Sequence, residues 1–460
     1  MSYGAERIQR LAHEPLRRLL LHYGLPAVVG TMVTALYNIV DRIFIGHGVS
    51  EYALSGLALT FPILIFIQAF GMLIGYGAAA RISILLGQDD RNGAERILGN
   101  AIVLTFVTQA LVLIPAMLWM KPLLEAFGGS ERTIPYATDY LSIIIPSNIF
   151  ATLCFSYNAV MRASGYPRKA MYTMLIGAVS NTLLDALFIY GFGWGIAGAA
   201  WATAIAMLLS AAFVLHHFFQ DESVIRFRRQ HIRLSWSDIF AILSIGLSPF
   251  AVQLLGSLVS VLFNTSFARV SPTAEAADIA IGSYGIIVSI AMLGFMFMLG
   301  VAQAMQPIVG YNYGAQQYER VRRAFGLCAG VNMSIGLVVV LATAVAPGWL
   351  AGIFTGSDVL LDATAHALSF ALGGFVLVGF QITATQFLQS IGVARRAFIL
   401  SISRQTFFFI PLLLILPDMF GVDGVWYSAL ISDISSGLLG MGLIYWQMKE
   451  LNNLPSTSPS

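Results

Sequence analysis

The chain has 460 residues, of which 57% are hydrophobic and only 10% are charged, and its net charge is +2 at neutral pH. A soluble domain carries about 25% charged residues. This chain therefore has too few charges to cover a water-facing surface, and its composition excludes a soluble protein. Its apolar runs are continuous and do not alternate with polar residues, which excludes a transmembrane β-barrel. We expect an all-α polytopic membrane protein.

The predicted elements begin with residues 1–24, which are basic and amphipathic and contain no cleavable signal sequence. We expect an interfacial helix there that leads into the first span. With about 20 apolar residues for each span, the rest of the chain predicts twelve transmembrane helices. Their expected limits are 22–46, 53–80, 97–120, 135–161, 169–190, 195–219, 239–268, 279–308, 324–347, 361–388, 396–416 and 423–447.

The basic residues predict the orientation of these spans. Of the 25 Lys and Arg residues, twenty fall in the tails and loops on one side and two fall on the other side. Cytoplasmic loops are enriched in Lys and Arg. We therefore expect the protein to lie in the inner membrane of the cell, with both termini in the cytoplasm.

The two halves of the chain resemble each other. Residues 24–41 can be aligned with 246–264, so that Pro26 falls on Pro249 and Asp41 falls on Asn264. Three further matches follow in the same order at a shift of 223 to 227 residues. Because each repeat holds six spans, both halves should have the same orientation and be related by a pseudo-two-fold axis along the membrane normal, with a cavity between the lobes. The predicted domains are an N-lobe (1–220), a cytoplasmic linker (221–238) and a C-lobe (239–460).

The duplicated six-span plan, the first-span pattern that ends in LYNIVD, the GYNYGA after span 8 and the RASGYPRKA after span 4 together resemble the MATE (multidrug and toxic compound extrusion) exporters. The resemblance covers roughly residues 14 to 447. It implies cation-coupled antiport, in which small organic compounds leave the cell as H⁺ or Na⁺ enters. It implies no cofactor and no nucleic-acid partner, and we expect a monomer surrounded by membrane lipids.

A few ionisable and polar residues lie inside the spans, where charge is costly and usually functional. At about 1.5 Å of rise per residue, Asp41 lies roughly 9 Å, Asp185 roughly 8 Å and Thr203 roughly 12 Å from the external ends of their spans. Asn181 precedes Asp185 by one helical turn and shares its face. These four residues supply hard oxygen ligands for Na⁺, and two close carboxylates raise each other's proton affinity. A purely structural role for the two acids is the alternative.

The resemblance adds roles to these residues. It implies that Asp41, Asn181, Asp185 and Thr203 form the cation-coupling site of the DinF-type branch, and that they are the metal ligands if the coupling ion is Na⁺. It also implies that Pro26 is the point at which the first helix bends. A proline inside a helix removes one backbone hydrogen bond, so a hinge there is physically reasonable. A kink without a function is the alternative, since kinks are common in membrane helices.

Other polar residues are less informative. Arg42 is expected to reach the outer interface or to pair with an external acid such as Glu51. In the second lobe, Arg404 and Asp433 lie at nearly equal depth and are expected to form a structural ion pair. The candidates for lining a substrate cavity are Gln253, Asn264, Gln303, Gln306 and Gln381.

The favoured function is therefore a secondary active multidrug efflux antiporter that exports organic, often cationic, compounds. The alternative is a lipid-linked glycan flippase of the wider superfamily, although such proteins more often have extra spans or a strongly basic central cavity. An intramembrane enzyme finds no support, because the chain has none of the motifs H-E-x-x-H or G-x-S-x-G and no protease-type aspartate pair. The sequence leaves open whether the coupling ion is H⁺ or Na⁺.

Overall fold

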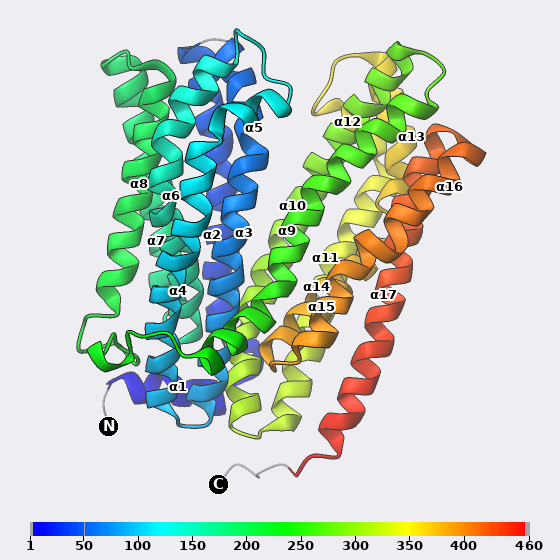
Figure 1. Cartoon of the computed structure of the whole chain (residues 1–460). Coiled ribbons are helices and arrows are strands. Elements are labelled where there is room, and N and C mark those ends of the chain that lie inside the picture. The colour runs from blue at the N-terminus through cyan, green and yellow to red at the C-terminus, as the bar shows by residue number, and fades with distance from the viewer. Residues whose placement is uncertain (1–2, 50, 456–460) are drawn as a thin grey trace.

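Two bundles of helices make up the computed structural model of the chain (Figure 1). The structure describes residues 3–49 and 51–455, with the side chains of residues 3–7, 38, 42, 46–48, 51–52 and 54 outside the description. Every regular element in the described part is a helix. The two bundles are six-span lobes, and they meet near the end that carries both termini and diverge toward the other end (Figure 1).

The first lobe contains spans 1 to 6 of the sequence. Its first helix, α1, lies across the end of the lobe near the N-terminus (Figure 1). The helices of this part are α1 (Tyr3–His13), α2 (Leu16–Gly48), α3 (Glu51–Gly87), α4 (Arg91–Leu118), α5 (Met120–Ala126), α6 (Ile134–Ala163), α7 (Pro167–Asp185), the π-helical η1 (Ala186–Gly191) and α8 (Gly195–His217).

The second lobe repeats this order after a connecting segment. A short helix follows the third span of each lobe, α5 in the first and α12 in the second. The remaining elements are η2 (Arg229–His231), α9 (Trp236–Val270), α10 (Ala274–Gly314), α11 (Tyr318–Val345), α12 (Pro347–Gly352), α13 (Asp358–Ala371), α14 (Phe375–Ser390), α15 (Ala394–Ile402), the π-helical η3 (Ser403–Phe409), α16 (Ile410–Phe420) and α17 (Val422–Asn452).

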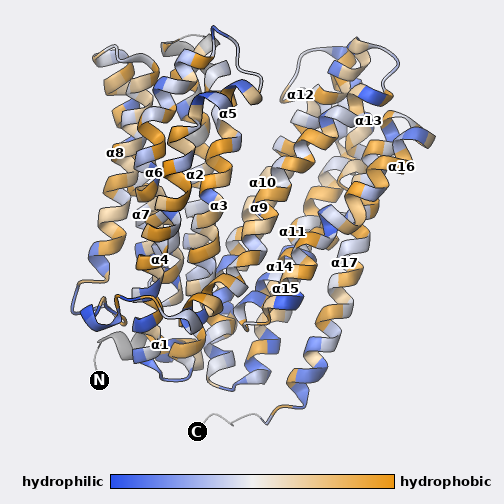
Figure 2. Cartoon of the chain, in the orientation of Figure 1, coloured by the Kyte–Doolittle hydropathy of each residue, from blue (hydrophilic) through white to orange (hydrophobic). Residues whose placement is uncertain are grey.

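Eleven of these helices, some with a π-helical turn, are long and apolar enough to cross a membrane. The remaining span, the tenth in chain order, is the pair α13 and α14, which is bent by 56°. Hydrophobic residues fill the middle of the helices and hydrophilic residues gather at both ends of the molecule (Figure 2). The twelve-span, two-lobe prediction is therefore confirmed.

The bend divides the single span that the sequence predicts at 361–388 into two helices. It falls at Gly373 and Gly374, which lie between the two helices. Glycine lowers helix stability by about 1 kcal/mol relative to alanine. A Cβ atom at Gly374 would also lie only 2.6 Å from the Cβ of Asp433, so the bend brings this backbone directly against α17.

Glycines also set the distance between the lobes. An added Cβ atom at Gly246 of α9 would lie 1.7 Å from the carbonyl oxygen of Leu73 in α3, and one at Gly77 would lie 2.0 Å from that of Ile242. Gly87 and Gly314, which are aligned in the repeat, meet the backbone of the opposite lobe in the same way. The lobes thus touch backbone to backbone at the end near the termini.

The segment between α8 and α9 packs on the first lobe. Glu95 of α4 is buried and pairs with Arg228 at 3.2 Å, while Arg96 pairs with Asp238 at 2.8 Å. Asn100 accepts a hydrogen bond from the backbone N–H of Ser235 at 2.6 Å. This part of the chain is therefore attached to α4 along its length.

Gly246→Ala should destabilise the protein by about 1–3 kcal/mol, because the added methyl group overlaps the Leu73 carbonyl. The control is Gly330→Ala in α11, where an added Cβ atom meets nothing within 4 Å. That substitution should be neutral or stabilising, by up to about 1 kcal/mol. Thermal unfolding in detergent measures both. Equal shifts in the unfolding temperature of the two variants would contradict the backbone contact at Gly246.

Candidate functional site

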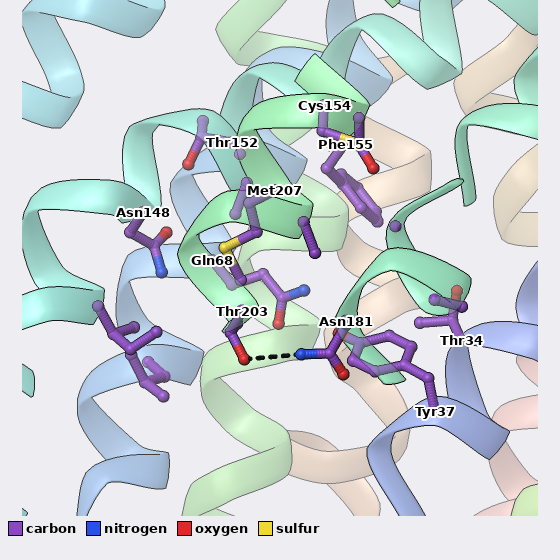
Figure 3. Close-up of a pocket in the computed structure, with 18 of the residues that line it drawn as sticks. Thr34, Tyr37, Gln68, Asn148, Thr152, Cys154, Phe155, Asn181, Thr203 and Met207 are labelled. Atoms are coloured by element: carbon purple, nitrogen blue, oxygen red, sulfur yellow. Dashed lines mark hydrogen bonds between the residues drawn. The ribbon is translucent and has the colours of Figure 1, made fainter. Parts of the chain in front are cut away.

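A cavity of about 340 Å³ lies inside the first lobe. Its wall is formed by α2, α3, α6, α7 and α8 (Figure 3). The sequence led us to expect a cavity between the lobes, whereas this one lies within a single lobe. Its polar and aromatic lining residues are Thr34, Tyr37, Asp41, Phe61, Gln68, Tyr140, Asn148, Thr152, Phe155, Asn158, Thr173, Asn181, Thr203 and Ser210.

Helical spacing explains why these side chains share one wall. On α2, Thr34, Tyr37 and Asp41 are separated by three and four residues, and therefore lie on one face. On α8, Thr203, Met207 and Ser210 repeat the pattern. Each helix thus presents one stripe to the cavity.

The four predicted coupling residues lie together in this part of the lobe. Asn181 Nδ2 donates a hydrogen bond to Thr203 Oγ1 at 3.1 Å (Figure 3). Asp41, Asn181 and Thr203 line the cavity, and Asp185 is fully buried one turn beyond Asn181. The charges of Asp41 and Asp185 are close enough to interact directly. The structure thus brings the four side chains into one cluster, and their coupling role stays a prediction.

Asp185 has an unusual environment for a buried acid. Neither of its carboxylate oxygens accepts a hydrogen bond from a described N–H or O–H group, and Asn181 Oδ1 also lacks a donor. Burying an ionised carboxylate without donors is costly. A proton shared with Asp41, or a Na⁺ ion bound by these oxygens, would remove that cost. The oxygen atoms of this cluster therefore fit either ion, H⁺ or Na⁺, as a transported co-substrate.

The helix changes its winding directly after Asp185. α7 ends at this residue and continues as the π-helical turn η1. Such turns occur frequently at functional sites, because they free or redirect backbone groups within a helix. The sequence does not predict this turn, since no residue pattern distinguishes it from an α-helix.

Most residues of the cavity wall are not among those that the sequence predicts for a site. On α6, a stripe with helical spacing contains Tyr140, Asn148, Phe155 and Asn158. The sequence shows this spacing. It does not distinguish a cavity wall from a packed helix face, because aromatic and amide residues also face neighbouring helices in the rest of the bundle.

Arg404 and Asp433 form an ion pair in the second lobe. Arg404 Nε lies 3.0 Å from Asp433 Oδ1, and the Asp433 side chain is buried. Arg404 lies in the π-helical η3, and Asp433 is the residue that packs on the bend at Gly374. A structural role for this pair stays a prediction that this arrangement supports.

The five predicted cavity residues of the second lobe are not among the residues that line the cavity of the first lobe. Gln303 and Gln306 of α10 donate across the lobe contact to the hydroxyl and the carbonyl oxygen of Tyr76, at 3.2 and 3.4 Å. Gln381 donates to the Leu400 carbonyl oxygen at 3.2 Å. Gln253 is half-buried and Asn264 is exposed. The predicted pairing of Arg42 with Glu51 lies outside the described side chains.

No cluster of three or more His, Cys, Asp or Glu side chains that could hold a metal ion occurs among the described residues. Beside the carboxylates of Asp41 and Asp185, amide and hydroxyl oxygens are the other side-chain oxygens in the cluster. Asn181 and Thr203 supply groups of that kind beside Asp185.

Twelve spans, two similar lobes and a cavity that holds polar and aromatic side chains among its helices are typical of membrane transporters. Comparison with known proteins specifies the class. The sequence model of the MatE family matches residues 26–187 and again 249–415, one match in each half of the chain. The protein is a member of the MatE family, and hence a transporter and not an enzyme.

Relatives and solved structures agree with this assignment. The multidrug export protein MepA of Staphylococcus aureus is 26% identical over 443 residues, which cover 96% of each chain. MepA of Staphylococcus saprophyticus is 24% identical over 428 residues, 93% of each chain. An outward-facing multidrug resistance MATE transporter has the same fold, with a TM-score of 0.89 at 23% identity over 97% of this chain and 98% of that one. A MATE protein in the bent conformation gives a TM-score of 0.90 at 22% identity, with 97% and 98% covered.

Asp185→Asn should leave the thermal stability unchanged or raise it, because the substitution removes a buried charge that has no hydrogen-bond donor. Asp433→Asn is the matched comparison. It should lower stability by about 1–3 kcal/mol, since it leaves the partly exposed Arg404 without its partner in the lobe. Unfolding temperatures in detergent measure both variants. A loss of stability in Asp185→Asn as large as that in Asp433→Asn would contradict the difference between the two sites.

Proposed function

We propose that this protein is a secondary active multidrug antiporter, which exports organic, often cationic, compounds in exchange for H⁺ or Na⁺. The observation that carries the proposal is the position of Asp41, Asn181, Asp185 and Thr203 in and beside the first-lobe cavity. Cavities of roughly 300 to 1,000 Å³ suit drug-sized ligands, and this one has about 340 Å³. Aromatic rings and methionines in its wall favour flat organic cations.

The carboxyl groups couple the two fluxes by competition. An organic cation in the cavity and a H⁺ or Na⁺ ion at Asp41 and Asp185 both neutralise the same negative charge. Binding of one therefore weakens binding of the other. Only a ligand with different affinities for two states can shift the protein between them. Neutralisation of the two acids supplies such a difference. Ionised carboxylates favour an arrangement of the surrounding helices in which water reaches them, and neutralisation removes this preference.

The arrangement of the lobes indicates one of the states that transport requires. They diverge at the end opposite the termini (Figure 1). With both termini in the cytoplasm, as the basic residues predict, the end at which the lobes diverge faces outward. One solved structure of the same fold is described as outward-facing.

Pro26 supports a moving first helix. α2 runs unbroken from Leu16 to Gly48 with Pro26 in its interior. Gly24 and Gly30 flank it, and at Gly30 the sulfur of Met174 in α7 occupies the space of a Cβ atom, at 2.4 Å. A missing backbone hydrogen bond next to small residues allows α2 to bend against α7. The two helices carry Asp41 on one side and Asn181 and Asp185 on the other.

Asp41→Asn should abolish gradient-driven drug efflux without loss of folded protein, because an amide at this position cannot titrate. The measurement is drug flux in proteoliposomes with an imposed proton or sodium gradient. Asp139→Asn is the control, since Asp139 is an exposed acid on α6 that does not line the cavity. It should transport like the unchanged protein.

Normal efflux by Asp41→Asn at an equal protein level would defeat the coupling proposal. Efflux that responds only to a proton gradient assigns H⁺ as the coupling ion, and efflux that responds only to a sodium gradient assigns Na⁺. Binding of a lipid-linked sugar, with no cation flux stimulated by drugs, would favour the glycan flippase instead.

Pro26→Ala should slow transport while it stabilises the protein by up to about 3 kcal/mol, because it restores a helical hydrogen bond and stiffens α2. Pro115→Ala in α4 is the matched control. It removes another helix-interior proline, away from the cavity, and should gain stability without a change in flux. Unfolding temperature and proteoliposome flux together separate the two effects. Unchanged flux in Pro26→Ala would show that this proline is not a hinge.

A further inference from the structure

A second cavity, of about 380 Å³, lies at the end of the molecule that carries the termini. It opens between the corner where α1 meets α2 and the turn that joins α6 to α7. Neither the proposed substrate path nor the coupling site uses it. Its lining residues are Arg10, Glu14, Leu19, His22, Tyr23, Gly165, Tyr166, Pro167, Arg168 and Lys169.

The charges around this cavity are unbalanced. Arg10, Arg168 and Lys169 bring three positive charges to it, and none of them pairs with a carboxylate of the described residues. Glu14 is the one acid in the wall, and it already pairs with Arg18 at 3.1 Å. Lys169 Nζ lies 3.3 Å from Gln220 Oε1 and 3.4 Å from His217 Nδ1, neither of which is a carboxylate atom. The cavity therefore has a surplus of positive charge.

The turn between α6 and α7 adds to the positive charge around the cavity. α7 begins at Pro167, so the wall includes the first turn of a helix of 19 residues. Backbone N–H groups at such an end lack helical acceptors and carry partial positive charge. Gly165 has a φ of +96°, which turns the chain sharply into the helix. Side chains and backbone thus present donors to the same space.

The opposite wall of the cavity is fixed to the other lobe. Leu11 is buried among residues of α10 and α11, and its carbonyl oxygen accepts hydrogen bonds from Asn312 at 3.0 Å and from Arg320 at 3.1 Å. The α1–α2 corner therefore follows the second lobe, whereas Arg168 and Lys169 belong to the first. A ligand in this cavity would bridge the two lobes.

We propose that this cavity binds a phosphate-bearing anion, held by Arg10 on one side and by Arg168 and Lys169 on the other. α1 is amphipathic and lies across the end of the lobe, where a membrane surface would meet it (Figure 1). Basic pockets between membrane helices near a membrane surface bind anionic lipid head groups. The phosphate comes either from an anionic phospholipid of the adjacent leaflet or from free phosphate in solution.

Such a ligand favours the present arrangement of the lobes, because it holds the α1–α2 corner to the start of α7. These are the helices whose other halves carry Asp41 and Asn181. Occupancy should therefore change the rate at which the lobes exchange states. This effect on transport rests on the proposed function, whereas binding does not.

The test measures binding to the full-length protein. In nanodiscs, phosphatidylglycerol should raise the unfolding temperature above that in phosphatidylcholine, and native mass spectrometry should detect retained phosphatidylglycerol. The double variant Arg10→Gln, Arg168→Gln should bind this lipid about 25-fold more weakly, since each basic residue near the surface contributes about fivefold. The matched control is Arg229→Gln, Arg233→Gln, which removes two exposed charges of the linker and should bind like the unchanged protein.

A second arm uses inorganic phosphate alone, on protein in a neutral detergent. Protection by phosphatidylglycerol but not by phosphate, lost in the first double variant, supports the site and assigns the lipid head group. Equal protection by phosphate, lost in the same variant, supports the site and assigns a free anion. If the first double variant and the linker control respond alike to both ligands, the proposal is overturned, whatever their transport activity.

Discussion

The cost of placing charge inside a membrane is the constraint on which this structure depends. A carboxylate in the bilayer interior costs several kcal/mol unless it is neutralised or faces water, and the described donors do not reach Asp185. The first lobe surrounds it with Asp41, Asn181 and a cavity. A carboxylate that served only for packing would lower the stability of the fold and have no other effect. This environment supports the proposed role of the cluster in exchanging one cation for another.

The same constraint explains why the two halves differ. Both descend from one six-span plan, as the double match of the family shows. The second lobe replaces the Asp41 position by Asn264, which is exposed and cannot titrate. It satisfies its own buried acid, Asp433, with Arg404. One lobe thus keeps its charge available, whereas the other compensates its charge internally.

Contact between the lobes follows a different principle. At Gly246 and Gly77, the backbones approach too closely for any side chain, which fixes the end near the termini while the other end stays open. The first helix links these two features. Its start packs with the second lobe through Leu19, its middle contains Pro26, and its far half carries Asp41. A bend in this one helix would therefore be felt at the cavity and at the lobe contact together.

The sequence by itself determined the twelve spans, the duplication and the four polar residues of the cluster. Hydrophobic length, repeat spacing and the rarity of intramembrane acids are local properties, and each can be read along a single chain. The 56° bend at Gly373 and Gly374, the turn after Asp185 and the location of the cavity within one lobe were decided only by tertiary structure. Tyr140, Asn148 and Phe155 became cavity residues because five helices meet around them. Their spacing along α6 would look the same if they faced a packed core, because helical periodicity defines a face but not its neighbour.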